Sequence, residues 1–212
     1  MSSSGKWYLA QKTLALQASK AMFTVQNQLA KLGDIPVNAA LKVFDGKISQ
    51  ILNYAAEIWG FHKETDIERV HSKFLRYILG LNRHTPNCAS LPETGRLQLI
   101  VTRQIKIIKY WFKLLNLKPD RILSLCYKYQ YGTAENDVNC WALDVKHLLC
   151  CFGFSEVWQT QGVGNENSFI NIFKDRCKDI NSQLIHSEML ETSKLDMYCN
   201  FKSLLTYHMR FT

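Results

Sequence analysis

Apolar residues recur every three or four positions along almost the whole chain, which is the spacing of an amphipathic α-helix. The first apolar stripe consists of Leu14, Ala18, Ala21, Val25, Leu29 and Leu32. Ser4 is expected to cap the start of this helix and Gly33 to end it. A second stripe begins after Pro36 and continues through Ile58 to a stop at Gly60. The pattern therefore predicts two long helices before the middle of the chain.

The same period predicts further helices along the rest of the chain. A third helix is expected to begin at Thr65 or Asp66 and to end at Gly80. Residues 83–97 contain two prolines and a glycine, which predicts a loop with one short helical turn. More helices are expected over residues 99–117, 120–131, 138–152, 155–158, 168–190 and 194–206, with a turn at 132–136 and a boundary near 159–167. Strand-like alternation is absent from the sequence, so we predict an all-α fold.

The composition is that of an ordinary globular chain of 212 residues, 47% of them hydrophobic. Few glycines and prolines exclude collagen-like and proline-rich proteins. The sequence has no run of 18 apolar residues, and its start is polar, so we expect neither a membrane partner nor secretion. Seven cysteines, an odd number without a CxxC pair, favour reduced thiols. An intracellular protein, cytoplasmic or nuclear, is therefore expected.

Positive charge is concentrated in the front part of the chain. Residues 1–120 contain 17 Lys and Arg against 8 Asp and Glu, a net charge of +9, whereas residues 121–212 have a net charge of −1. A basic segment beside a neutral one suggests a surface that faces a polyanion, with nucleic acid favoured over a membrane. A solvated basic face without any ligand is the alternative.

Several cations repeat at helical spacing within this basic segment. Arg69, Lys73 and Arg76 are four and three residues apart on the third predicted helix, and four more cations lie in the helix predicted over 99–117. A fringe of Lys and Arg at this spacing neutralises phosphates without reading bases. The predicted contacts to the backbone of an RNA or DNA duplex are Arg69, Lys73, Arg76, Arg96, Arg103, Lys106, Lys109 and Lys113.

Other chemistries find little support in the sequence. His147 and Cys150 have a spacing compatible with a metal, but a second ligand pair is missing, so we expect Cys140, Cys150 and Cys151 to be small buried side chains. The sequence lacks a GxSxG elbow, a glycine-rich phosphate loop and an Asp-Asp pair. Trp59, Tyr110 and Trp111 lie in or beside apolar stripes, which favours core packing over base stacking. We expect no metal, no cofactor and no enzymatic activity.

Two consecutive motifs resemble a known family. Residues 51–60 read ILNYAAEIWG, and residues 67–81 read IERVHSKFLRYILGL. They resemble the region that follows the polymerase palm in the reverse transcriptases of animal non-LTR retrotransposons. Further similar motifs are SSGKW at 3–7, QASKA at 17–21, IKYWFKLLNL at 108–117, Trp141 with Lys146, and FGFS at 152–155 with Trp158.

The resemblance covers nearly the whole chain and implies a thumb and post-thumb region. Residues 1–120 would form a helical thumb-like bundle, and residues 121–212 a helical connector. The implied task is to grip a template–primer duplex while a palm domain performs nucleotide transfer. The family's catalytic Asp-Asp box and zinc knuckle have no counterpart here, which predicts a fragment that lacks both and whose partner is the palm.

The sequence also departs from the family pattern. The glycine that the family carries before its Ala-Glu pair is Ala55 here, and the family's YGELGR element is replaced by residues 91–96, LPETGR. Ala55 has less backbone freedom than glycine. Two other interpretations stay open: a helical module that binds protein, and a retroelement remnant without function.

Overall fold

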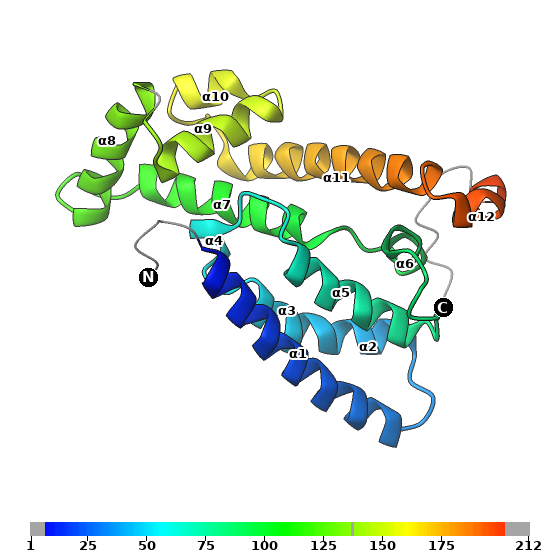
Figure 1. Cartoon of the computed structure of the whole chain (residues 1–212). Coiled ribbons are helices and arrows are strands. Elements are labelled where there is room, and N and C mark those ends of the chain that lie inside the picture. The colour runs from blue at the N-terminus through cyan, green and yellow to red at the C-terminus, as the bar shows by residue number, and fades with distance from the viewer. Residues whose placement is uncertain (1–6, 137, 202–212) are drawn as a thin grey trace. The chain divides into compact units, whose positions relative to one another are not determined.

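The computed structural model describes residues 7–136 and 138–201 (Figure 1). Every regular element in these two ranges is helical, and neither range contains a strand. The predicted all-α fold is therefore confirmed. The chain forms two compact units: unit 1 contains the described residues up to Tyr54, Lys63–Leu99 and those from Ile180 onward, and unit 2 contains Ala55–His62 and Ile100–Asp179. The expected division at residue 120 stays a prediction.

Unit 1 is built around the long N-terminal helix α1 (Tyr8–Lys31). This helix packs along α3, η1 and α5, and α5 packs against α6 (Figure 1). The other elements of unit 1 are α2 (Val37–Val43), the π-helical turn η1 (Phe44–Ile48), α3 (Ser49–Leu52), α5 (Thr65–Ile78), α6 (Asn87–Glu93), the C-terminal part of α11 (Glu166–Leu190), the 3₁₀ turn η2 (Ser193–Leu195) and α12 (Asp196–Phe201).

The apolar stripe of α1 forms part of the core of unit 1. Ala18, Val25 and Leu29 are buried as predicted, whereas Leu32 lies beyond the end of the helix and is exposed. The described helix begins after Trp7, and the predicted cap Ser4 lies outside the described residues. A second core cluster consists of Leu41, Leu75, Cys88, Ala89, Leu91, Ile185, Met189 and Leu195.

The second long helix is interrupted, contrary to the prediction. The π-helical turn η1 follows α2, and residues Asn53–Ala55 form a turn between α3 and the next helix. Ala55 has a φ of 50°, in the left-handed region that L-residues rarely adopt. The Asn53 side chain donates a hydrogen bond to the Ser49 carbonyl oxygen at 3.0 Å, which closes α3. The apolar period continues across this turn, so the stripe alone did not reveal the break.

Unit 2 contains the strongly apolar helix α7 and the helices that cover it. Its elements are α4 (Ala56–Trp59), α7 (Leu99–Leu115) from Ile100 onward, α8 (Ile122–Glu135), α9 (Trp141–Cys151), α10 (Ser155–Gln159) and the N-terminal part of α11. Helix α8 packs against α9, and α9 packs against α10 (Figure 1). Trp111, Phe112, Phe173 and Trp158 are buried in the core of this unit.

The boundaries of several elements differ from those expected. The predicted turn at 132–136 is wrong, because α8 continues through Gly132 to Glu135. The region 83–97 contains the seven-residue helix α6, with Pro92 inside it, rather than a single turn. Of the helix expected at 194–206, residues 202–206 lie outside the described part. Within the described ranges, no helix combines the length and apolar character needed to cross a bilayer.

Candidate nucleic-acid interface

The first residue of α7 is held by a buried carboxylate. Glu68 on α5 is 8% exposed, and its Oε2 accepts a hydrogen bond from the Leu99 backbone N–H at 3.0 Å. The preceding N–H, that of Gln98, donates to Asn181 Oδ1 at 3.2 Å. Negative charge at a helix N-terminus is stabilising because the backbone N–H groups there lack partners within the helix. The start of α7 is therefore fixed by groups inside unit 1.

Helix α7 presents lysines on its polar side in unit 2. Lys109 and Lys113 are exposed and Lys106 is half-buried. We call these three residues the lysine face. They are three and four residues apart, so they lie along one side of the helix over about 10 Å. The sequence of α7 contains no Asp or Glu, and its remaining surface is largely buried and apolar. The helix therefore places positive charge on its surface without a carboxylate of its own.

Arg103 does not belong to this surface, contrary to the prediction. Its side chain is 0% exposed, and its guanidinium lies over the Trp59 ring, 5.5 Å from the centroid. Arg103 Nη1 also donates to the His62 carbonyl oxygen at 3.5 Å. Arg103 is one turn before the fully buried Ile107, on the side of α7 that the segment Trp59–His62 covers. A guanidinium held in this way is unable to reach a phosphate.

Gly60 permits this close approach to α7. A Cβ at Gly60 would lie 2.9 Å from the Arg103 Cβ and 2.5 Å from the Ala56 carbonyl oxygen. Neither contact is tolerable, so only glycine fits here.

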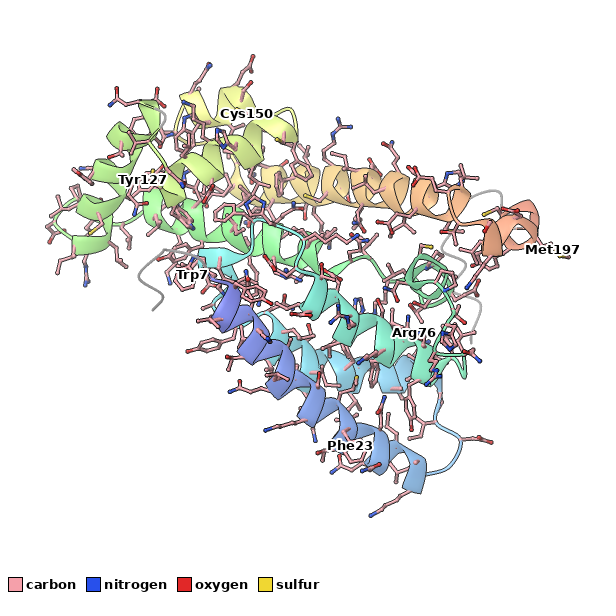
Figure 2. All side chains as sticks on the ribbon, in the orientation of Figure 1. Trp7, Phe23, Arg76, Tyr127, Cys150 and Met197 are labelled. Carbon is pink, nitrogen blue, oxygen red and sulfur yellow. The ribbon has the colours of Figure 1, made fainter. Side chains whose placement is uncertain are left out.

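The three cations predicted on α5 have different environments. Lys73 is exposed. Arg69 Nη1 lies 2.7 Å from Asp66 Oδ1, in an ion pair between residues three apart. Arg76, at the end of α5 in Figure 2, donates from Nη1 to the Thr85 carbonyl oxygen at 3.3 Å and to the Asn87 side-chain oxygen. Burial lowers the pKa of the Arg76 guanidinium. These bonds connect Arg76 to Thr85 in the loop before α6 and to Asn87, the first residue of α6.

Arg96 also has a structural role in unit 1. Its guanidinium donates to both carboxylate oxygens of Asp45, at 2.6 and 2.7 Å. A weaker bond of 3.5 Å connects Nη2 to the Leu41 carbonyl oxygen. The two-pronged geometry is the strongest that an arginine makes with a carboxylate. Arg96 therefore joins the segment after α6 to the π-helical turn η1.

The predicted residues thus differ in exposure and in what holds their side chains. Arg69, Arg76, Arg96 and Arg103 are engaged by carboxylates, backbone oxygens or an aromatic ring of the chain itself. The lysine face and Lys73 project from α7 in unit 2 and from α5 in unit 1, respectively.

The buried tryptophans confirm the prediction of core packing. Trp59 and Trp111 are 5% and 0% exposed. Trp111 Nε1 donates to the Tyr127 hydroxyl at 2.6 Å, and that hydroxyl donates to Gln161 Oε1 at 2.6 Å. Each polar atom in this chain of bonds is satisfied inside the core. Tyr110 is half-buried, with its ring edge-on to Trp141 at 5.8 Å.

The thiols are more exposed than expected. Cys150 and Cys151 are both exposed near the end of α9, where Figure 2 shows Cys150, and Cys140 is half-buried. The prediction that these three are buried small side chains is therefore wrong. By contrast, Cys88 and Cys177 are buried, and burial raises the pKa of the Cys177 thiol to about 12. Among the described residues, no group of three or more His, Cys, Asp or Glu side chains is arranged to hold a metal ion.

Comparison with known proteins places the chain in no family. The chain matches no protein-family model, no curated protein and no solved structure.

Proposed function

We propose that this chain grips a template–primer duplex through contacts to its phosphates, as the post-palm region of a non-LTR retrotransposon reverse transcriptase. In this proposal it binds independently of base sequence and transfers no nucleotides itself. Nucleotide transfer belongs to a palm domain, the partner that the motif resemblance implies. The chemistry asked of this chain is charge neutralisation and positioning.

The observation that carries the proposal is the lysine face of α7. Three lysines lie along one side of a helix without a carboxylate, and that helix is fixed by its buried apolar side. A lysine ammonium on a flexible stem binds a phosphate as a point charge, without the planar geometry that reads a base edge. Such a row suits a backbone whose charges repeat at short intervals.

Two of the predicted arginines are held inside the chain and lie outside this surface. Arg103 is inside unit 2, and Arg96 is paired with Asp45, so neither contributes to phosphate binding. The proposed contacts are Lys106, Lys109 and Lys113. This set is smaller than the one predicted from the sequence, and it makes the proposal testable with three substitutions on a single helix.

Equilibrium binding to a labelled RNA–DNA hybrid tests the proposal directly. The triple variant K106Q/K109Q/K113Q keeps helix propensity while it removes three charges. We expect its affinity to be at least about tenfold weaker than that of the unaltered chain at about 0.1 M salt, and the loss to be equal for two hybrids of unrelated sequence.

A matched control separates the lysine face from net charge. The variant K12Q/K20Q/K31Q removes the same number of charges from exposed positions of α1. Its affinity for the hybrid should remain within about threefold of the unaltered chain, because these lysines are not among the proposed phosphate contacts and charges that make no contact act only through salt-screened attraction. Equal losses in both triple variants, with both folded, would contradict the proposal.

A further inference from the structure

Helix α1 carries a second apolar row on the side that faces away from the core. Leu9, Leu16 and Phe23 are 66%, 58% and 64% exposed, and Phe23 is labelled on α1 in Figure 2. The core side of the same helix contains Gln11, Ala15, Ala18, Met22, Val25 and Leu29. Large apolar side chains therefore lie on both sides of α1, and one of the two sides has no cover within the described residues.

The exposed apolar row repeats once in every seven residues. Its members are seven residues apart, and an α-helix returns to nearly the same side after seven residues, with a drift of about 20°. The row is therefore almost straight and extends for about 21 Å from Leu9 to Phe23. The row supplies one apolar position in each heptad, and a partner helix can pack its own apolar side chains beside these three residues.

Positive charge accompanies the apolar row. Lys12 lies one turn after Leu9, and Lys20 lies between Leu16 and Phe23, so both are on the same side of α1 as the row. Lys31 follows near the end of the helix. All three lysines are exposed, and none of them is paired with a carboxylate of the described residues. The 24 residues of α1 include no Asp or Glu.

The lysines beside the apolar row favour one kind of binding partner over the others. A second copy of α1 would bring lysines against lysines, which costs stability at a helical contact. A nucleic acid backbone would satisfy the lysines but would leave the three apolar side chains in water. A helix with apolar residues at heptad spacing and flanking carboxylates satisfies both features at once.

We propose that the exposed face of α1 docks an acidic amphipathic helix of a partner protein. Leu9, Leu16 and Phe23 would bury against the apolar stripe of that helix, and Lys12 and Lys20 would pair with its carboxylates. The apolar row supplies affinity, and the lysines set the choice of partner. This inference concerns unit 1 and does not depend on the lysine face of α7.

A designed peptide serves as the probe. Three heptads with Leu at positions a and d and Glu at positions e and g give an acidic amphipathic helix that repels its own copies at pH 7. Fluorescence anisotropy of the labelled peptide, titrated with the full chain, should show saturable binding. A peptide with Lys at e and g in place of Glu should bind at least about tenfold more weakly.

Two variants of the chain separate the contributions of the face. The variant L16Q/F23Q should weaken binding of the acidic peptide at least about tenfold, because the burial of two large side chains is lost. The variant K12Q/K20Q should weaken binding less and should reduce its dependence on salt. All four positions are exposed, so both variants should keep the circular dichroism spectrum of the unaltered chain. The matched control is Leu125→Gln, which removes an exposed leucine from α8 and should leave binding unchanged.

Several results of the peptide-binding experiment would overturn the proposal. Absence of binding, or equal binding of the acidic and basic peptides, would refute the partner chemistry. Retention of affinity by L16Q/F23Q would show that the peptide binds elsewhere. Displacement of the peptide by a duplex, self-association abolished by Phe23→Gln, or binding to anionic vesicles that L16Q/F23Q abolishes would assign the face to nucleic acid, a second copy or a membrane surface instead.

Discussion

The Arg96 guanidinium holds the Asp45 carboxylate with two parallel hydrogen bonds, Nη1 to Oδ1 at 2.6 Å and Nη2 to Oδ2 at 2.7 Å. The two residues are 51 positions apart in the sequence. Asp45 lies in the π-helical turn η1, and Arg96 follows the end of α6. The pair therefore joins two segments of unit 1 that local sequence does not connect.

Arg96→Lys should destabilise the chain although it keeps the charge. A lysine makes single contacts and loses the fork that matches both carboxylate oxygens. We expect the free energy of unfolding to fall by about 1–2 kcal/mol, measured by urea denaturation. Arg96→Lys in an Asp45→Asn background should cost about 1 kcal/mol less than in the unaltered chain. Additive effects of the two substitutions would show that the bonds contribute nothing to stability.

Ala55→Gly should stabilise the chain. Ala55 has a φ of 50°, which costs an L-residue about 1–2 kcal/mol relative to glycine, whereas glycine loses about 0.4–1 kcal/mol through the entropy of the unfolded chain. The net gain expected in urea denaturation is about 0.5–1 kcal/mol. The control Ala39→Gly, at an exposed position inside α2, should instead lose about 0.5–1 kcal/mol. A loss at Ala55 as well would contradict the strain assigned to this turn.

The helical spacing of apolar residues was enough to predict the all-α fold and most helix positions, because it reports directly which side of a helix is buried. It did not predict the turn at Asn53–Ala55, because the apolar period continues across it and alanine rarely adopts a positive φ. It also did not predict the burial of Arg103. Position 103 lies at the edge of the polar side of α7, and its burial depends on the approach of Trp59 and Gly60, which are far away in sequence. Long-range ion pairs such as Arg96 with Asp45 leave no local signal.

Tyr127 should make stability depend on pH in alkaline solution. Burial raises the pKa of its hydroxyl to about 12, whereas a tyrosine in the unfolded chain ionises near its ordinary pKa of 10.0. The folded state therefore keeps the proton longer. The stability contributed by the neutral hydroxyl is complete below pH 10 and is lost as the pH rises from about 10 to about 12.

Tyr127→Phe isolates this contribution. At pH 7 the variant should be less stable by about 1–2 kcal/mol, because the indole N–H of Trp111 loses its acceptor. The difference in unfolding free energy between the two proteins should shrink from pH 10 to pH 12, measured by urea denaturation at each pH. A constant difference across this range would contradict the shifted pKa.

Substitution by Gln should affect stability at Arg103 and duplex binding at Lys109. Arg103→Gln removes a buried guanidinium from the Trp59 ring and should lower the free energy of unfolding by about 2 kcal/mol, with the salt dependence of duplex binding unchanged. Lys109→Gln is at an exposed position, so its stability should change by less than about 0.5 kcal/mol. The salt dependence of duplex binding by Lys109→Gln should fall. A reduced salt dependence for folded Arg103→Gln would place that arginine on the binding surface after all.

The slope of duplex affinity against salt tests the central claim most directly. Each lysine that contacts a phosphate contributes about 0.9 to the slope of log affinity against log salt concentration for B-form DNA. On a B-form DNA duplex we predict that K106Q/K109Q/K113Q lowers this slope by about 2.7, from three contacts at about 0.9 each, while K12Q/K20Q/K31Q leaves it unchanged. A folded K106Q/K109Q/K113Q variant with the slope and affinity of the unaltered chain would contradict the account and would make the lysine face a solvated surface.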